Sequence, residues 1–223
     1  IAGYDAARSP FIYVDFTCGT WGGRPWADGL DGNSNIFANM ASQSVEITEA
    51  EYPIQILSYE FVSDRAGAGC YRGGTPFRRE YRFLEEEGLL QVRSDRRTFR
   101  PYGLYGGKPG KPSRNTMNPG PGERELPSKL TETIRFGDVF CHELAGAGGW
   151  GDPLERDPRA VLRDYRNDFI SNDTALRDYG VVIDVIALTI DDDATKARRS
   201  ELKATRKWSN PPTVLFTDED EET

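Results

Sequence analysis

The chain has 223 residues, which allows one domain of ordinary size or two small ones. Its 28 Lys and Arg against 36 Asp and Glu leave a net charge of -8, which argues against non-specific nucleic-acid binding, because such binding needs clustered cations on phosphates. A hydrophobic share of 37% and an aromatic share of 11% exclude collagen-like and membrane classes and argue against wholesale disorder. No run approaches the ~18 apolar residues of a membrane-spanning helix, so we expect no membrane partner. From the net charge we expect no nucleic-acid partner either.

The first half of the chain is typical of a β-rich fold. β-Branched and aromatic runs predict strands at residues 11–16, 54–62, 77–84 and 89–93. We expect the last two to form a hairpin across residues 85–88. Glycine-rich loops at 19–32 and 64–75 separate the strands.

The second half begins with residues 102–121, which are rich in Gly and Pro and predict no regular element. Two strands, 131–136 and 138–144, are then expected to meet at Gly137. After a third glycine-rich loop at 145–151 the predicted elements become helical. Asp157 and Pro158 are typical of a helix start, so helices are predicted at 158–166, at 173–178 before Gly180, and from 191–193 to about 207. The apolar run 181–190 predicts one strand.

Together these patterns predict an α+β fold with a mixed or antiparallel sheet core, long Gly/Pro loops and a helical C-terminal region. The predicted domain boundaries are 1–152 for the β-rich part, 153–216 for the helical region packed on it, and 217–223 for an acidic tail.

The glycine-rich loops carry no complete phosphate-binding motif. Residues 146–151 have the G-x-G-x-x-G spacing of dinucleotide-binding proteins, but Asp152 and Pro153 break any helix that would follow directly. Tight β-turns or close backbone packing are therefore the favoured interpretation of these glycines. Asp64, Arg65 and Arg72, beside Gly73 and Gly74, could bind an anion, but a surface turn with a salt bridge is the favoured interpretation.

Metal and thiol chemistry have little support in the sequence. The chain has one histidine, His142, without a His or Cys partner at metal-ligand spacing, so a hydrogen-bonded strand histidine is expected. Three scattered cysteines, Cys18, Cys70 and Cys141, form no CxxC pair, which favours reduced thiols of a cytoplasmic protein.

Several ordered motifs resemble the end of the hydantoinase B family. They are GGWGDPLERDP at 148–158, residues 161–165 and 178–182, GCYRGG at 69–74, REYRF at 79–83, PYGLYGG at 101–107 and the turn at 136–138. The resemblance covers nearly the whole chain. It implies a subunit, or half of one, of an ATP-dependent enzyme such as N-methylhydantoinase, 5-oxoprolinase, or acetone or acetophenone carboxylase.

The resemblance implies a division of labour between two subunits. An A-type subunit binds ATP and phosphorylates the substrate or bicarbonate, and the B-type subunit supplies a site for a divalent metal. The family's metal ligands belong to an N-terminal half with motifs such as Asn-Asp-Pro-Tyr and His-His-x-Asp, which do not occur in this sequence. The chain therefore resembles a C-terminal half, and we expect it to hold neither ATP nor metal. The implied partners are the A-type subunit, the N-terminal half and a small cyclic amide or ketone substrate.

The expected function is that of a B-type subunit, or a fragment of one, in an ATP-dependent cyclic-amide hydrolase. An ATP-dependent ketone carboxylase and a non-catalytic scaffold half are the alternatives. Candidates for a substrate-pocket wall or a subunit interface lie in the first two glycine-rich loops and comprise Arg24, Asp28, Asp64 and Arg72. No catalytic residue can be assigned from the sequence.

Overall fold

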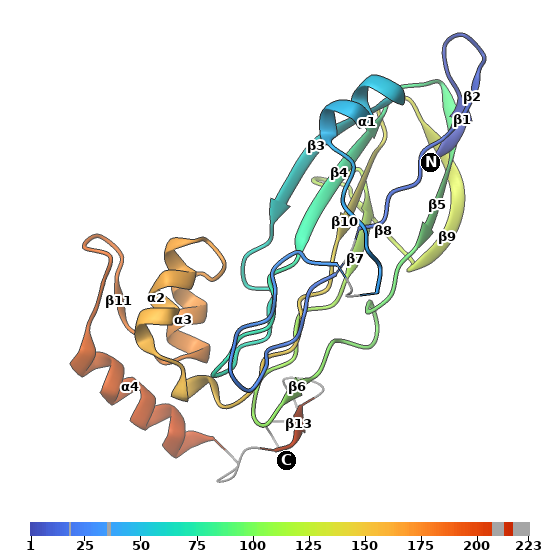
Figure 1. Ribbon diagram of the computed structural model, residues 1–223. Helices are drawn as coiled ribbons and strands as arrows, with labels where there is room; N and C mark the ends of the chain where they lie inside the picture. The colour runs from blue at the N-terminus through green and yellow to red at the C-terminus, as the bar shows by residue number, and fades with distance from the viewer. Residues whose placement is uncertain (18, 35–36, 207–211, 216–223) are drawn as a thin grey trace.

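The computed structural model describes residues 1–17, 19–34, 37–206 and 212–215. Two antiparallel sheets and one short helix lie at one end of the molecule, the helices of the C-terminal region lie at the other, and extended segments lie between them (Figure 1). The expected α+β class is therefore confirmed. Cys18 and the predicted acidic tail lie outside the described residues, and the predicted domain boundaries stay predictions.

The two sheets form a sandwich. One has the strand order β2 (Pro10–Ile12), β1 (Ala2–Tyr4), β5 (Glu87–Arg93) and β9 (Lys129–Arg135). The other has the order β3 (Ile54–Phe61), β4 (Phe77–Phe83), β10 (Val139–Glu143), β7 (Arg114–Met117) and β8 (Arg124–Leu126). A short helix, α1 (Val45–Glu51), begins at the N-cap Ser44 and leads into β3.

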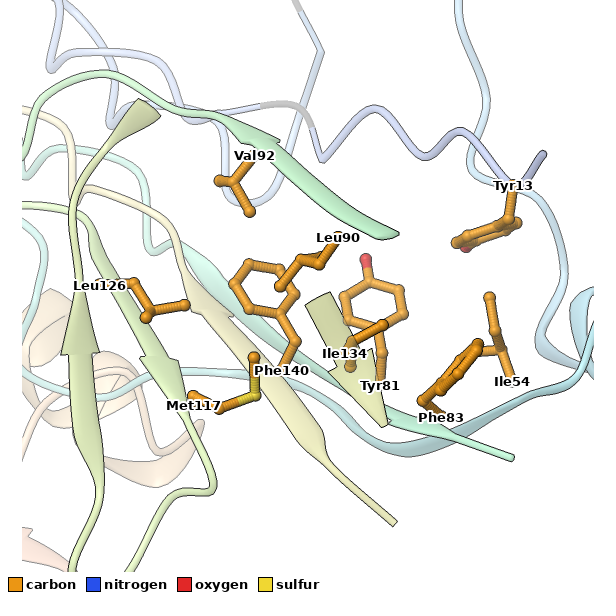
Figure 2. Close-up of a cluster of buried hydrophobic side chains, with 10 residues drawn as sticks. All are labelled: Tyr13, Ile54, Tyr81, Phe83, Leu90, Val92, Met117, Leu126, Ile134 and Phe140. Carbon is orange, nitrogen blue, oxygen red and sulfur yellow. The ribbon is translucent and has the colours of Figure 1, made fainter. Parts of the chain in front are cut away.

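The main core lies between these sheets. Along β4 every second side chain is buried, as expected when one face of a strand packs inward. Ten buried side chains from both sheets and the segment after β2 meet there (Figure 2): Tyr13, Ile54, Tyr81, Phe83, Leu90, Val92, Met117, Leu126, Ile134 and Phe140. Each such side chain contributes ~1.5–3 kcal/mol by leaving water.

The helical region forms a second, smaller core. It contains a 3-10 turn (Pro153–Glu155), α2 (Pro158–Arg166), α3 (Asn172–Asp178) and α4 (Asp192–Thr205). Asp157 caps α2 and Gly180 adopts φ +61 after α3, so both predicted helix-end signals are confirmed. Val161, Ala175 and Tyr179 are buried between these elements. Among the described residues no helix is both long and apolar enough to cross a membrane.

The predicted hairpin between residues 77–84 and 89–93 is wrong. β4 pairs with β3 and β10, whereas β5 pairs with β9 and β1 in the other sheet. The reason is that both strands carry a strongly apolar face, with Phe83 on β4 and Leu90 on β5. Those faces pack against each other across the core instead of lying side by side.

Three further expectations differ from the structure. Residues 181–190 form a two-stranded hairpin, β11 (Ile183–Asp184) and β12 (Thr189–Ile190), because the carboxylate of Asp184 accepts hydrogen bonds from the backbone N–H groups of Ile186 and Ala187 and bends the chain. The strand expected at 11–16 ends at Ile12. The stretch 102–121, for which no regular element is expected, contains β7 and a short strand β6 (Gly103–Leu104). The partner of β6 is β13 (Val214–Leu215).

The extended segments between sandwich and helices form what we call the glycine bundle, residues 19–31, 65–75, 101–111 and 144–151. They are joined by backbone hydrogen bonds, such as Gly23 N to Gly148 O at 2.9 Å, Gly67 N to Ala147 O at 2.8 Å and Gly149 N to Lys108 O at 2.9 Å. The bundle is thus a tightly layered arrangement of main chains, distinct from either sheet.

Glycine is required in the bundle by close approach. A Cβ placed on Gly73 would overlap the carbonyl oxygen of Ala147, and one on Gly148 would overlap the carbonyl oxygen of Tyr102. Both neighbours are backbone atoms, which cannot rotate away as a side chain could. This explains why the sequence concentrates glycine in these loops without a phosphate-binding motif.

We predict that Gly73→Ala lowers the free energy of unfolding by about 3 kcal/mol, the upper range for overpacking. Gly22→Ala is the matched control, because the nearest atom to its new Cβ would lie at 3.6 Å, an ordinary contact. Urea unfolding of both variants measures the difference. Equal stability of the two variants would contradict the close packing of the bundle.

Candidate functional site

The most highly charged buried feature lies where the glycine bundle meets α2. Two arginines and three aspartates converge there, and we call them the buried charge cluster: Asp28, Asp31, Arg72, Arg156 and Asp164. Arg72 is 4% exposed, Arg156 2% and Asp164 3%. The cluster draws on two distant parts of the sequence. The glycine bundle contributes Asp28, Asp31 and Arg72. The helical region contributes Arg156, which precedes α2, and Asp164, which lies on α2.

Asp164 bridges the two guanidinium groups. Arg156 binds both carboxylate oxygens of Asp28, at 2.6 and 2.8 Å, and donates to Asp164 Oδ2 at 2.7 Å. Arg72 binds both oxygens of Asp31, at 2.6 and 3.0 Å, and donates from Nε to Asp164 Oδ1 at 3.2 Å. Such two-pronged pairs are the strongest geometry for arginine and carboxylate.

The cluster also holds the main chain. Asp28 accepts from the backbone N–H of Arg72 at 2.9 Å, and Asp31 accepts from that of Thr75 at 2.6 Å. Arg156 donates to the carbonyl of Cys70 at 3.0 Å. The cluster therefore fixes the two glycine-rich loops to each other and to the start of the helical region.

The protonation states follow from these contacts. Burial by itself raises the pKa of Asp28, but the hydrogen bonds and charge of Arg156 outweigh it and hold that pKa below its usual value. Burial by itself lowers the pKa of Arg156, and hydrogen bonding to Asp28 outweighs it, so the pKa is raised. Both groups of the Asp28–Arg156 pair are therefore held in their charged forms, and each charge is matched by the other.

Two of the four sequence-predicted site residues, Asp28 and Arg72, thus come together. Arg24 lies beside them, and its guanidinium donates to the carbonyl of Asp28 at 2.7 Å. Asp64 lies apart from them: it has φ +61, and its carboxylate accepts from the backbone N–H of Ser171 at 2.8 Å. Their role as pocket wall or interface stays a prediction.

Sequence reasoning missed Arg156, Asp164 and Asp31 as members of the cluster. One local signal was available on α2, where Asp164 lies three residues after the fully buried Val161 and so shares its inward face. A carboxylate on that face requires a buried partner. Nothing local indicates that this partner is Arg72, 92 residues away in the sequence.

Asp64 also lines a charged cleft of about 590 Å³ beside the glycine bundle. Its other charged lining residues are Arg65, Arg97, Lys111, Arg114, Glu125 and Glu143. Arg65 pairs with Glu143 at 3.1 Å and Arg97 with Glu125 at 2.8 Å. The arginines of the cleft are therefore already matched by carboxylates, and the cleft suits a polar partner better than a single anion.

His142 lies on β10 and is 8% exposed, with its Nδ1 2.6 Å from the amide oxygen of Asn115. This agrees with the expected hydrogen-bonded strand histidine. Burial lowers the pKa of His142 to about 4, so the imidazole is neutral at physiological pH. Nearby, Asp15 accepts from Arg79 and from the hydroxyl of Tyr81, each at 2.5 Å.

The described residues do not fit the divalent metal that the family resemblance implies. Within the described ranges no three His, Cys, Asp or Glu side chains are placed to hold a metal ion. The three aspartates that do converge are bound by Arg72 and Arg156 instead. Cys70 and Cys141 are free thiols, and burial raises the pKa of each.

The chain is similar to known proteins at three levels, namely a family model, individual sequences and solved structures. The family model described as hydantoinase B/oxoprolinase matches residues 1–153. The chain is 34% identical over 178 residues to the B-type subunit of a putative D-/L-hydantoinase from Pseudomonas sp. (strain NS671), and the match covers 78% of this chain and 30% of that protein. Its fold resembles the ATP-dependent caprolactamase from Pseudomonas jessenii, with a TM-score of 0.71 and 29% identity, covering 82% of this chain and 33% of that one.

An acetone carboxylase structure shares the fold, with a TM-score of 0.73 and 20% identity over 91% of this chain and 32% of that chain. The chain therefore spans about a third of the length of the relatives that it matches.

For the buried charge cluster we predict that Arg156→Met lowers the free energy of unfolding by about 3–5 kcal/mol, because Asp28 and Asp164 would stay buried without their partner. Arg124→Met is the matched control: Arg124 also binds a carboxylate with two hydrogen bonds, to Glu132, but at the surface, and its loss costs below ~1 kcal/mol. Urea unfolding at neutral pH compares them. Similar losses in both variants would show that the cluster is no stronger than a surface ion pair.

For His142 we predict a pH-dependent loss of stability. The unfolded chain takes up the proton near pH 6.5 and the folded chain only near pH 4, so the free energy of unfolding falls by about 3 kcal/mol as the pH drops through this window. His142→Gln removes this contribution and should flatten the profile relative to the unchanged chain. Parallel profiles for the two proteins would contradict the low pKa.

Proposed function

This chain belongs to the hydantoinase B/oxoprolinase family, and from that premise we propose that it is part of the B-type subunit of an ATP-dependent enzyme that hydrolyses cyclic amides. The observation that carries the proposal is the family match over residues 1–153, which includes the whole glycine bundle and the cluster residues Asp28, Asp31 and Arg72. The likeness to an ATP-dependent caprolactamase supports the same reaction class.

The contribution of this chain is a rigid framework. The buried charge cluster holds the glycine-rich loops in one arrangement, and the sandwich and helical region flank them. Because the described residues fit no metal ion, metal chemistry in the complete enzyme would come from polypeptide outside this chain. ATP binding would likewise belong to an A-type partner subunit, and the site of action would be the cytoplasm.

The four sequence-predicted candidates have different parts in this proposal. Asp28 and Arg72 position the loops through the cluster, with Arg24 holding the turn at Asp28. Asp64 lines the charged cleft, whose mixed charges suit a partner subunit. We therefore propose the cleft as the contact face for another subunit and the glycine-rich loops as the support for the substrate pocket.

The test combines this chain with an A-type subunit and the remaining part of a B-type subunit. Phosphate release from ATP is measured with hydantoin, 5-oxoproline or ε-caprolactam, each with and without bicarbonate. We expect one cyclic amide to raise ATP hydrolysis at least about tenfold, independently of bicarbonate. The A-type subunit alone is the control.

Two other outcomes would contradict the proposal. Turnover that requires bicarbonate together with acetone or acetophenone would assign the chain to a ketone carboxylase. A stable complex without substrate-dependent turnover would assign it to a non-catalytic scaffold.

A further inference from the structure

One edge of β5 is open over half of its length. β9 pairs with β5 on one side along the whole strand, from Glu87 to Arg93. On the other side β1 pairs only with Gly88 and Leu89. Within the described part of the chain, no strand pairs with the stretch from Leu90 to Arg93 on that side.

The alternation of hydrogen bonds shows which backbone groups face the gap. Ile1 donates to Tyr13 O at 2.9 Å and accepts from Tyr13 N at 2.8 Å, so the backbone groups of the next residue, Ala2, face Leu89 on β5. In an antiparallel sheet the backbone groups alternate sides along a strand. Gln91 and Arg93 therefore direct their N–H and C=O groups toward the open side, whereas Leu90 and Val92 direct theirs toward β9.

The other wall of the gap is the segment that follows β2. Its side chains keep the alternation of a β-strand: Tyr13 is buried, Val14 is 62% exposed, Asp15 points inward to Arg79 and Tyr81, and Phe16 is 64% exposed. Tyr13 still pairs with Ile1, but among the described residues no strand pairs with Val14, Asp15 or Phe16. It has the residue pattern of a strand whose neighbour is missing.

A cavity of about 470 Å³ fills the space between these two walls. Leu90 and Val92 line one side, Val14 and Asp15 line the other, and Phe140 and His142 of β10 lie at its base. Figure 2 shows Leu90 and Val92 directed from β5 toward Phe140 and Tyr81, with Tyr13 across the gap. The backbone groups of Gln91 and Arg93, which no described strand pairs with on this side, are the feature that a strand edge offers to an incoming peptide.

We propose that this cavity is the slot for one further β-strand, supplied by the part of a B-type subunit that this chain does not span. The strand runs antiparallel to β5, in line with β1, and pairs with Gln91 and Arg93 on one side and with Asp15 on the other. This inference rests on the proposed function for the identity of the partner, because the chain covers only about a third of its relatives.

The register defines what the strand must carry. Its central residue, opposite Val92 and Asp15, points inward onto Phe140 and must be apolar and of moderate size. The residues on either side of it point outward beside Val14 and Phe16. Large apolar side chains are exposed around the slot, namely Ile12, Val14, Phe16 and Leu89, and the outward residues of the strand would lie beside Val14 and Phe16.

The probe is a five-residue extension, Gly-Ser-Thr-Val-Thr, joined ahead of Ile1, whose valine occupies the inward position. Gly-Ser-Thr-Asp-Thr is the matched control: it has the same length and equally replaces the partly buried terminal ammonium of Ile1 with an amide, but it places a second carboxylate beside Asp15. Amide hydrogen exchange is followed by NMR. The amides of Leu90 and Val92, already bonded to β9, are internal references.

With the valine extension we expect the amides of Gln91 and Arg93 to exchange at least about tenfold more slowly than in the unextended chain, and with the aspartate extension we expect little change. Unchanged exchange with the valine extension would overturn the slot, and equal slowing by both extensions would overturn its apolar inward position. The experiment involves no ATP turnover, so its failure is distinct from failure of the proposed function.

Discussion

The buried charge cluster is the constraint on which the arrangement of this molecule depends. The glycine bundle has few side chains with which to form an apolar core, because its backbones lie too close together for a Cβ at positions such as Gly73. Its loops are instead fixed by Asp28 and Asp31, whose carboxylates hold Arg72 and Arg156. Since Arg156 and Asp164 belong to the helical region, their contacts with Asp28 and Arg72 join that region to the glycine bundle.

The sandwich and the bundle serve different purposes in this account. The sandwich is stabilised by ordinary apolar burial, yet it is incomplete along β5, where Gln91 and Arg93 face a cavity. The bundle is held by backbone hydrogen bonds and by the buried charge cluster, and a charged cleft lies beside it. A chain with one unfinished sheet edge and one fixed set of loops suits a component of a larger subunit.

Local signals in the sequence were sufficient for the helix ends, where Asp157 and Gly180 act as predicted, and for the strands on either side of Gly137. Local signals failed to predict the pairing of β4 and β5. Two strands that follow each other in the sequence can pair in one sheet or face each other from two sheets, and the packing of the whole core determines which arrangement forms. Asp28 and Arg72 were recognised as candidates. Arg156, the partner of Asp28, was not recognised, because it lies 128 residues from Asp28 and no local pattern joins the two.

A double-mutant cycle between Asp28 and Arg156 tests the central claim most directly. The free energies of unfolding of Asp28→Asn, Arg156→Met and the double variant are measured by urea titration at neutral pH. If the cluster joins the glycine bundle to the helical region, the two substitutions are coupled by at least about 2 kcal/mol. Additive effects, within about 0.5 kcal/mol, would contradict the claim.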